Sequence, residues 1–149
     1  MTHLAGRAAL PGGGGDNGDA RFRAIATAVV PEAATLSENE WRFAAAIIAD
    51  AVAARPPAMR RQLAVFVRAL DLVSFVRRGR SFGALQQSER TALLEWLGAS
   101  PLLALRRGVW GVRTLSFMGY YARANAATAI GYRASADGWA ARRDESVSR

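Results

Sequence analysis

The chain has 149 residues, which is enough for one domain with a hydrophobic core, and a net charge of +8 from 20 arginines against 12 acidic residues. No cysteine is present, which excludes disulfides, thiolate nucleophiles, cysteine-ligated metals and covalently attached c-type haem. No lysine is present either, which excludes Schiff-base chemistry and the lysine of a phosphate-binding loop.

Residues 1–20 are expected to form a disordered arm. The stretch from Pro11 to Asp19 is mostly glycine, and fixing each glycine in a regular element costs conformational entropy. A phosphate-binding loop would need a preceding strand, a following helix and a Lys-Ser/Thr pair, none of which the sequence indicates here. We therefore interpret the arm as a flexible tether.

Three helices are predicted between residues 21 and 78. The first covers about residues 21–30 and ends at Pro31. Ser37 and Glu40 form a capping box at the start of the second, which ends before Pro56. Because apolar residues surround the second helix nearly completely, we expect it to be the central, buried helix. The third spans about residues 57–78 and has an apolar stripe of Leu63, Phe66, Val67, Leu70 and Val73.

Further helices are predicted in the second half of the chain. Residues 81–85 connect to a helix over about residues 89–97, capped by Ser88 and stopped by Gly98 in a left-handed conformation. Ser100 is expected to cap the next helix, which begins at Pro101 and runs to about Tyr121. A short helix over about residues 124–130 and an irregular aromatic segment follow.

The sequence shows no strand-like alternation, so the predicted fold is all-α with five or six helices. We expect one helical domain over residues 21–140 and a loose polar tail over residues 141–149.

Groups that could run a reaction are scarce. The only histidine, His3, lies in the arm, and most acidic residues lie at helix starts, where capping and the macrodipole explain them. Glu32 and Asp71 lack such an explanation and have no partner recognisable in the sequence. The stretch from Asp16 to Asp19 has the composition of a calcium loop but lacks the flanking helix pair and the terminal glutamate. We therefore expect no catalytic, cofactor-binding or metal-binding residues, and no enzymatic activity of the chain itself.

The helix from Pro101 to Tyr121 is the strongest candidate for a functional surface, because it combines arginines with the aromatic residues typical of interface hot spots. Three interpretations stay open: a core helix with arginines in solvent, a surface that docks on a protein, and a surface that rests on an anionic membrane. Gly108, Gly111 and Gly119 favour docking on a protein, because glycine permits close backbone approach. The predicted partner interface consists of Arg106, Arg107, Trp110, Arg113, Phe117, Met118, Tyr120, Tyr121, Tyr132 and Trp139.

A series of short motifs runs through the same part of the chain. They are Glu89-Arg90, Leu93, Leu94 and Trp96, then Ser100-Pro101, Leu105-Arg106, Met118-Gly119-Tyr120-Tyr121 and Ala129-Ile130-Gly131-Tyr132. In order and spacing they resemble gluconate 2-dehydrogenase subunit 3, the small non-catalytic subunit of flavin oxidoreductases of the glucose-methanol-choline type. They are also similar to the region before the flavin domain of fused long-chain alcohol oxidases. The resemblance covers about residues 60–140 and implies an accessory role, with FAD on a large partner chain. This chain has no strand–Gly-x-Gly-x-x-Gly–helix unit that would hold a flavin.

We therefore expect a non-catalytic accessory subunit that docks on and stabilises a flavin-dependent alcohol or sugar dehydrogenase or oxidase. The alternative is a basic helical protein associated with an anionic membrane surface or with nucleic acid. Association with nucleic acid is least favoured, because the arginines follow no known binding motif.

The sequence shows neither an N-terminal apolar stretch of signal-peptide length nor an uncharged run that would span a membrane. We expect a cytoplasmic location, with peripheral membrane contact as a variant, and export only together with a partner that carries a signal.

Overall fold

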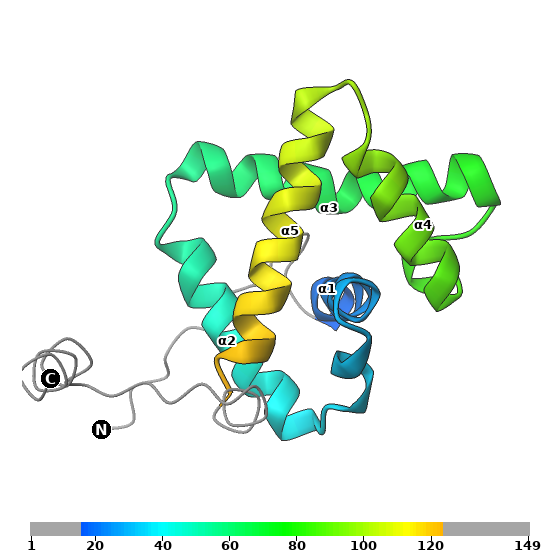
Figure 1. The fold of residues 1–149 in the computed structure, drawn as a ribbon. Coiled ribbons are helices and arrows are strands. Elements are labelled where there is room, and N and C mark those ends of the chain that lie inside the picture. Colours follow the sequence, from blue (N-terminus) through cyan, green and yellow to red (C-terminus); the bar gives the residue numbers. More distant parts are fainter. Residues whose placement is uncertain (1–15, 124–149) are drawn as a thin grey trace, which may run out of the picture.

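The computed structural model describes residues 16–123, and this part of the chain is helical with no strand (Figure 1). The predicted all-α fold is therefore confirmed. The elements are α1 (Asp16–Val29), the 3-10 turn η1 (Pro31–Thr35), α2 (Glu38–Ala53), α3 (Pro57–Arg78), the 3-10 turn η2 (Phe82–Ala84), α4 (Gln87–Gly98) and α5 (Leu103–Tyr121).

The central helix of the fold is α5. It crosses the molecule and packs against α1, α2, α3 and α4 (Figure 1). The prediction that α2 would be central is wrong: Phe43 on its outer side is 53% exposed, while Trp41 and Ile48 on the inner side are buried. The apolar residues around α2 therefore do not mean that it is covered on all sides.

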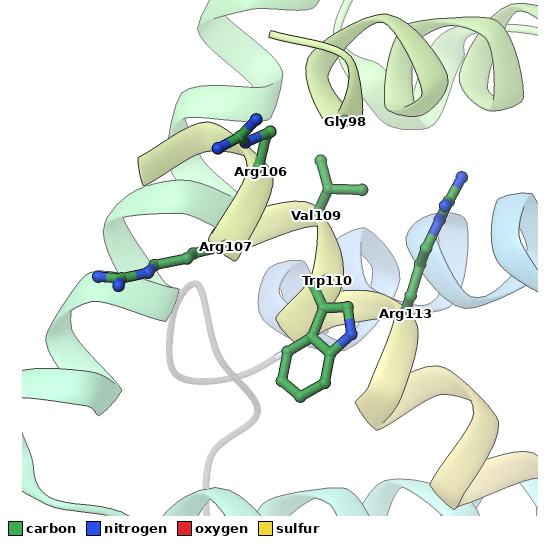
Figure 2. A pocket seen from close by; sticks show the side chains of 6 residues that line it. All are labelled: Gly98, Arg106, Arg107, Val109, Trp110 and Arg113. Atoms are coloured by element: carbon green, nitrogen blue, oxygen red, sulfur yellow. The ribbon is translucent and has the colours of Figure 1, made fainter. Parts of the chain in front are cut away.

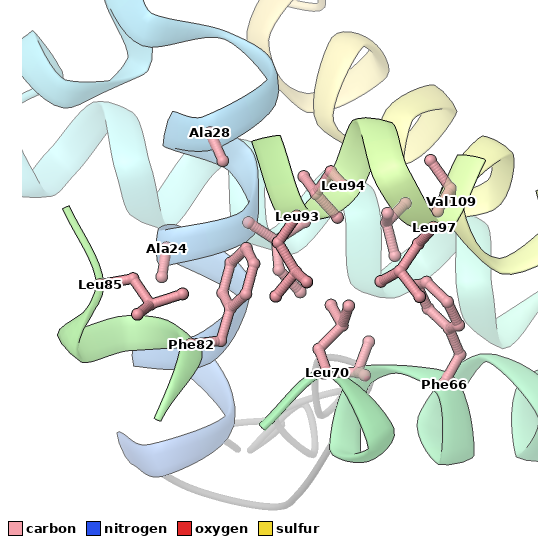
Figure 3. Close-up of a cluster of buried hydrophobic side chains, with 13 residues drawn as sticks. Ala24, Ala28, Phe66, Leu70, Phe82, Leu85, Leu93, Leu94, Leu97 and Val109 are labelled. Carbon is pink, nitrogen blue, oxygen red and sulfur yellow. The ribbon is translucent and has the colours of Figure 1, made fainter. Parts of the chain in front are cut away.

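Two connected clusters of buried side chains form the core. The larger one joins α1, α3, η2, α4 and α5 (Figure 3). The smaller one joins α1 to α2, and Leu115 of α5 packs against it. Leu63 of α3 touches both clusters. Helix α1 contributes to both because it lies between α2 and α4, with Phe22 in one cluster and Ile25 in the other.

Two glycines allow α5 to take the central place. A Cβ on Gly108 would overlap the ring of Phe66 on α3, and a Cβ on Gly119 would lie 2.6 Å from Cδ1 of Ile48 on α2. A Cβ on Gly111 would meet nothing closer than Cδ1 of Leu63 at 3.8 Å. The close approach at Gly108 and Gly119 is therefore made within the chain, and these glycines do not indicate an external docking partner.

The first three helices follow the predicted signals, with one correction. Ser37 and Glu40 form both hydrogen bonds of the capping box at the start of α2, as predicted. Helix α3 has the predicted bounds and is capped at its C-terminal end by Gly79, whose φ of 70° is the left-handed conformation that suits glycine. Helix α1, however, begins at Asp16, so residues 16–20 belong to a helix and not to the expected arm. Residues 1–15 lie outside the described range.

The boundaries of α4 and α5 differ from the predicted ones. Gln86 caps α4 through a capping box with Glu89, so Ser88 lies inside the helix. Gly98 is the last residue of α4 and does not have a positive φ. The hydroxyl of Ser100 accepts a hydrogen bond from the Leu102 amide at 3.2 Å, and α5 begins at residue 103. The predicted helix over residues 124–130 and the tail lie outside the described residues.

Candidate interaction surface

One face of α5 remains open to solvent although the helix is central. Its inner positions, Val109, Val112, Ser116 and Gly119, are buried against the other helices. The outer positions follow at helical spacing, and the largest of them, Trp110, is 72% exposed in the middle of the helix. We call this surface the α5 face, made up of Leu103, Arg106, Arg107, Trp110, Arg113, Phe117 and Tyr121.

A shallow hollow of about 340 Å³ lies beside Trp110, between α5 and the end of α4. Val109 and Gly98 line it together with Trp110 and three arginines (Figure 2). In this view Arg106 and Arg113 point to the side of α4, and Arg107 points to the opposite side of Trp110. The hollow is thus apolar in the middle and cationic on both sides.

Within the described residues, the arginines of the α5 face have no anionic partner. The guanidinium groups of Arg106, Arg107 and Arg113 make no hydrogen bond or ion pair with any residue in the range 16–123. Elsewhere in the molecule guanidinium groups are used internally: Arg23 binds Glu38 at 2.8 Å and stacks on Trp41, 5.0 Å from the ring centroid.

The far end of the α5 face is aromatic. The rings of Phe117 and Tyr121 stack with centroids 6.1 Å apart, and Tyr120 meets Tyr121 edge to face at 5.1 Å. Met118 and Tyr120 are half-buried, so they belong partly to the packing of the helix. Exposed Phe117 and Tyr121 extend the surface of Trp110 along the helix.

Arg123 ties the end of α5 to the start of α2. Its guanidinium binds the Glu40 carboxylate at 2.7 Å, lies 4.4 Å from the ring centroid of Tyr120, and donates to the Tyr120 carbonyl. The pKa of Glu40 lies below its ordinary value because the Ser37 amide and hydroxyl donate to the carboxylate and, to a smaller extent, because Arg123 is positively charged. The capping box was visible in the sequence, but a partner 83 residues away was not.

Asp71 also has partners that the sequence did not reveal. One carboxylate oxygen accepts a hydrogen bond from the Phe82 amide at 3.1 Å, and the other lies 2.6 Å from Nε of Arg21. Asp71 therefore holds the η2 turn and α1 against α3, which is a structural role. This role could not be predicted from the sequence, because the three residues lie in three separate elements that only the fold brings together.

Of the predicted interface residues, six lie on the α5 face: Arg106, Arg107, Trp110, Arg113, Phe117 and Tyr121. Met118 and Tyr120 are half-buried beside it. Tyr132 and Trp139 lie outside the described residues.

A second exposed apolar surface, which was not predicted from the sequence, lies on the outer side of α3. Val65, Leu72, Phe75 and Val76 are all exposed there. Next to it Arg77 lies 4.2 Å from the ring centroid of Trp96 on α4. Leu72 and Val76 follow Val65 at helical spacing, and this second stripe could have been found by the same periodicity that indicated the buried one.

No family model matches the chain, and none of the curated proteins or solved structures compared with it matches either. Within residues 16–123, no group of three or more His, Cys, Asp or Glu side chains is placed to hold a metal ion. None of the helices in this range is both long enough and apolar enough to span a lipid bilayer.

Proposed function

We propose that this protein is a non-catalytic accessory subunit that docks through the α5 face on a larger protein. The observation that carries the proposal is the position of Trp110, which is 72% exposed between arginines in the middle of the central helix. Trp, Tyr and Arg are enriched among the residues that dominate the binding energy of protein interfaces, and contiguous exposed apolar side chains mark interaction sites.

The partner in this proposal is a large FAD-containing oxidoreductase of the glucose-methanol-choline type, which oxidises an alcohol group of a sugar or a long-chain alcohol. The support for this class of partner is the order of motifs from Glu89-Arg90 to Tyr132, which resembles subunit 3 of gluconate 2-dehydrogenase. In this chain Arg90 donates to the carbonyls of Leu85 and Gly83, and Leu93 and Leu94 lie in the core. These motif residues therefore shape the helical scaffold that presents α5.

The chemistry of the chain is compatible with a role without catalysis. It has no cysteine and no lysine, and its only histidine, His3, lies far from α5 in the sequence. In this proposal the FAD and the reacting groups belong to the partner, and this chain contributes a surface that stabilises it. The proposed location is the cytoplasm.

A second candidate function is attachment to an anionic membrane surface. It is favoured by Leu102 and Leu103, which are exposed at the start of α5 next to Arg106 and Arg107. Apolar and cationic side chains in this arrangement enter the headgroup region of anionic lipids.

Co-purification of the tagged full chain from its native host tests the proposal. We expect a large protein with the absorbance spectrum of a bound flavin to co-purify. Trp110→Ala should reduce its recovery by about 10-fold or more, as expected for a hot-spot residue. Phe43→Ala on the outer side of α2 is the control, because Phe43 is also exposed and lies on another element. A chain that purifies as a stable monomer without a flavoprotein contradicts the proposal.

A further inference from the structure

The α5 face has a regular pattern along its length. Leu103, Trp110 and Phe117 follow each other at intervals of seven residues, and all three are exposed. Arg106 and Arg113 are also seven residues apart and point to the same side of Trp110 (Figure 2). A seven-residue repeat keeps these side chains on one line of a helix, which is the pattern through which two helices pair.

The charges of this face are not balanced by the described chain. The guanidinium groups of Arg106, Arg107 and Arg113 have no hydrogen bond or ion pair within residues 16–123. Four acidic residues of the same range are engaged elsewhere: Glu38, Glu40 and Asp71 in ion pairs and Glu89 in the capping box of α4. The cationic groups around Trp110 are thus not neutralised by any carboxylate of residues 16–123.

A second copy of the chain does not fit this surface. Pairing two α5 faces would bring the three arginines of each copy together without any acidic residue between them, and like charges at an interface are repulsive. A negatively charged occupant instead complements these arginines.

The shape of the surface favours a protein segment over a lipid bilayer. The surface beside Trp110 is hollowed, with Val109 and Gly98 along the hollow and arginines at its sides (Figure 2). A recess of this kind can accept a protruding side chain from a protein partner.

We propose that the partner presents an acidic helical segment to the α5 face. Its carboxylates pair with Arg106, Arg107 and Arg113, and its apolar side chains cover Trp110 and Phe117. This inference rests on the proposed function, since it assigns the chemistry of the segment through which the flavoprotein is bound. It adds that the complex is held by charge as well as by apolar contact, so that its affinity falls with salt.

A pair of matched charge reversals tests the inference. Arg106→Glu/Arg107→Glu changes the fourth and fifth residues of α5, and Arg60→Glu/Arg61→Glu changes the fourth and fifth residues of α3. Both pairs are exposed, and both reversals change the net charge equally. Because the two pairs occupy the same place in their helices, any effect on the stability of the chain should be similar.

The measurement is the Kd between the full-length chain and the flavoprotein with which it co-purifies, at low and at high salt. We expect the α5 reversal to weaken binding by roughly 10-fold or more and to flatten its salt dependence, while the α3 reversal changes Kd by less than about twofold. Thermal unfolding of both variants checks that neither loses its fold.

The outcomes separate this inference from the proposed function. If the α5 reversal leaves Kd unchanged while Trp110→Ala weakens binding, the acidic segment is overturned and the docking function stands. If the wild-type chain binds no flavoprotein, both are overturned. The acidic protein segment is also overturned if the wild-type chain binds phosphatidylserine vesicles and the α5 reversal abolishes only that binding.

Discussion

Single residues connect parts of this fold that are distant in the sequence, and Glu40 is the clearest example. Its carboxylate closes the capping box of α2 with Ser37 and also binds Arg123 at the end of α5. The folded state therefore favours the ionised form of Glu40, and the pKa of this group is lowered. The start of α2 and the end of α5 are held by the same carboxylate.

The lowered pKa of Glu40 predicts a specific dependence of stability on pH. A carboxylate with a depressed pKa stabilises the folded state above its unfolded pKa, and this contribution is lost as pH falls through the folded pKa. We expect Glu40→Gln to be less stable than the wild type at pH 7 and the difference to shrink below about pH 4.5, the ordinary pKa of the group. Urea unfolding between pH 7 and pH 3 measures it. A difference that stays constant over this range would contradict the role of the charge.

Two glycines of α5 give a second prediction for single residues. Gly108→Ala should destabilise the fold by about 1–3 kcal/mol, because its Cβ would overlap the buried ring of Phe66. Gly111→Ala is the matched control, because its Cβ would meet only ordinary contact with Leu63 at 3.8 Å. The stability of the Gly111→Ala variant should rise by up to about 1 kcal/mol, because alanine has a higher helix propensity than glycine. Thermal unfolding of both variants gives the comparison, and equal effects would contradict the close packing of α5 on α3.

The positions of the helices in the sequence could be predicted well from local signals. The way in which the helices pack against each other could not. The capping box at Ser37 and the Pro57 start gave correct helices, because such signals act within one turn of the chain. Helix α5 and not α2 is the central helix of the fold. Which helix is central depends on which helix backbones can approach each other closely. Gly108 and Gly119 decide this, and a sequence shows a glycine without showing what it faces.

The two faces of α3 provide a prediction for an element. Leu70 on the inner face is 1% exposed and Leu72 on the outer face is 65% exposed. Leu70→Ala should therefore cost about 2–5 kcal/mol of stability. Leu72→Ala should change stability by less than about 0.5 kcal/mol, because its side chain makes few contacts to lose. Chemical denaturation of both variants measures the contrast, and a large loss for Leu72→Ala would place the outer stripe in the core.

The whole molecule combines a core that forms within residues 16–123 with a helix that serves both core and surface. The sequence predicted that the stretch after Pro101 would matter, because it concentrates aromatic residues and arginines. It could not separate Trp110 and Phe117 on the outer side from half-buried Met118 and Tyr120, since that division depends on where α2 and α3 lie. The net charge of +8 is compatible with an acidic partner or an anionic membrane surface, and it does not show where either would bind.

Site-specific photo-crosslinking in the native host tests the central claim most directly. A photoreactive phenylalanine derivative replaces Trp110 on the α5 face, or Phe43 on the outer side of α2 as the control, since both positions are exposed. The account predicts that position 110 crosslinks to a large flavin-containing oxidoreductase, identified by mass spectrometry, and that position 43 does not. Crosslinking to lipid alone, no crosslink at position 110, or equal crosslinking from both positions would contradict it.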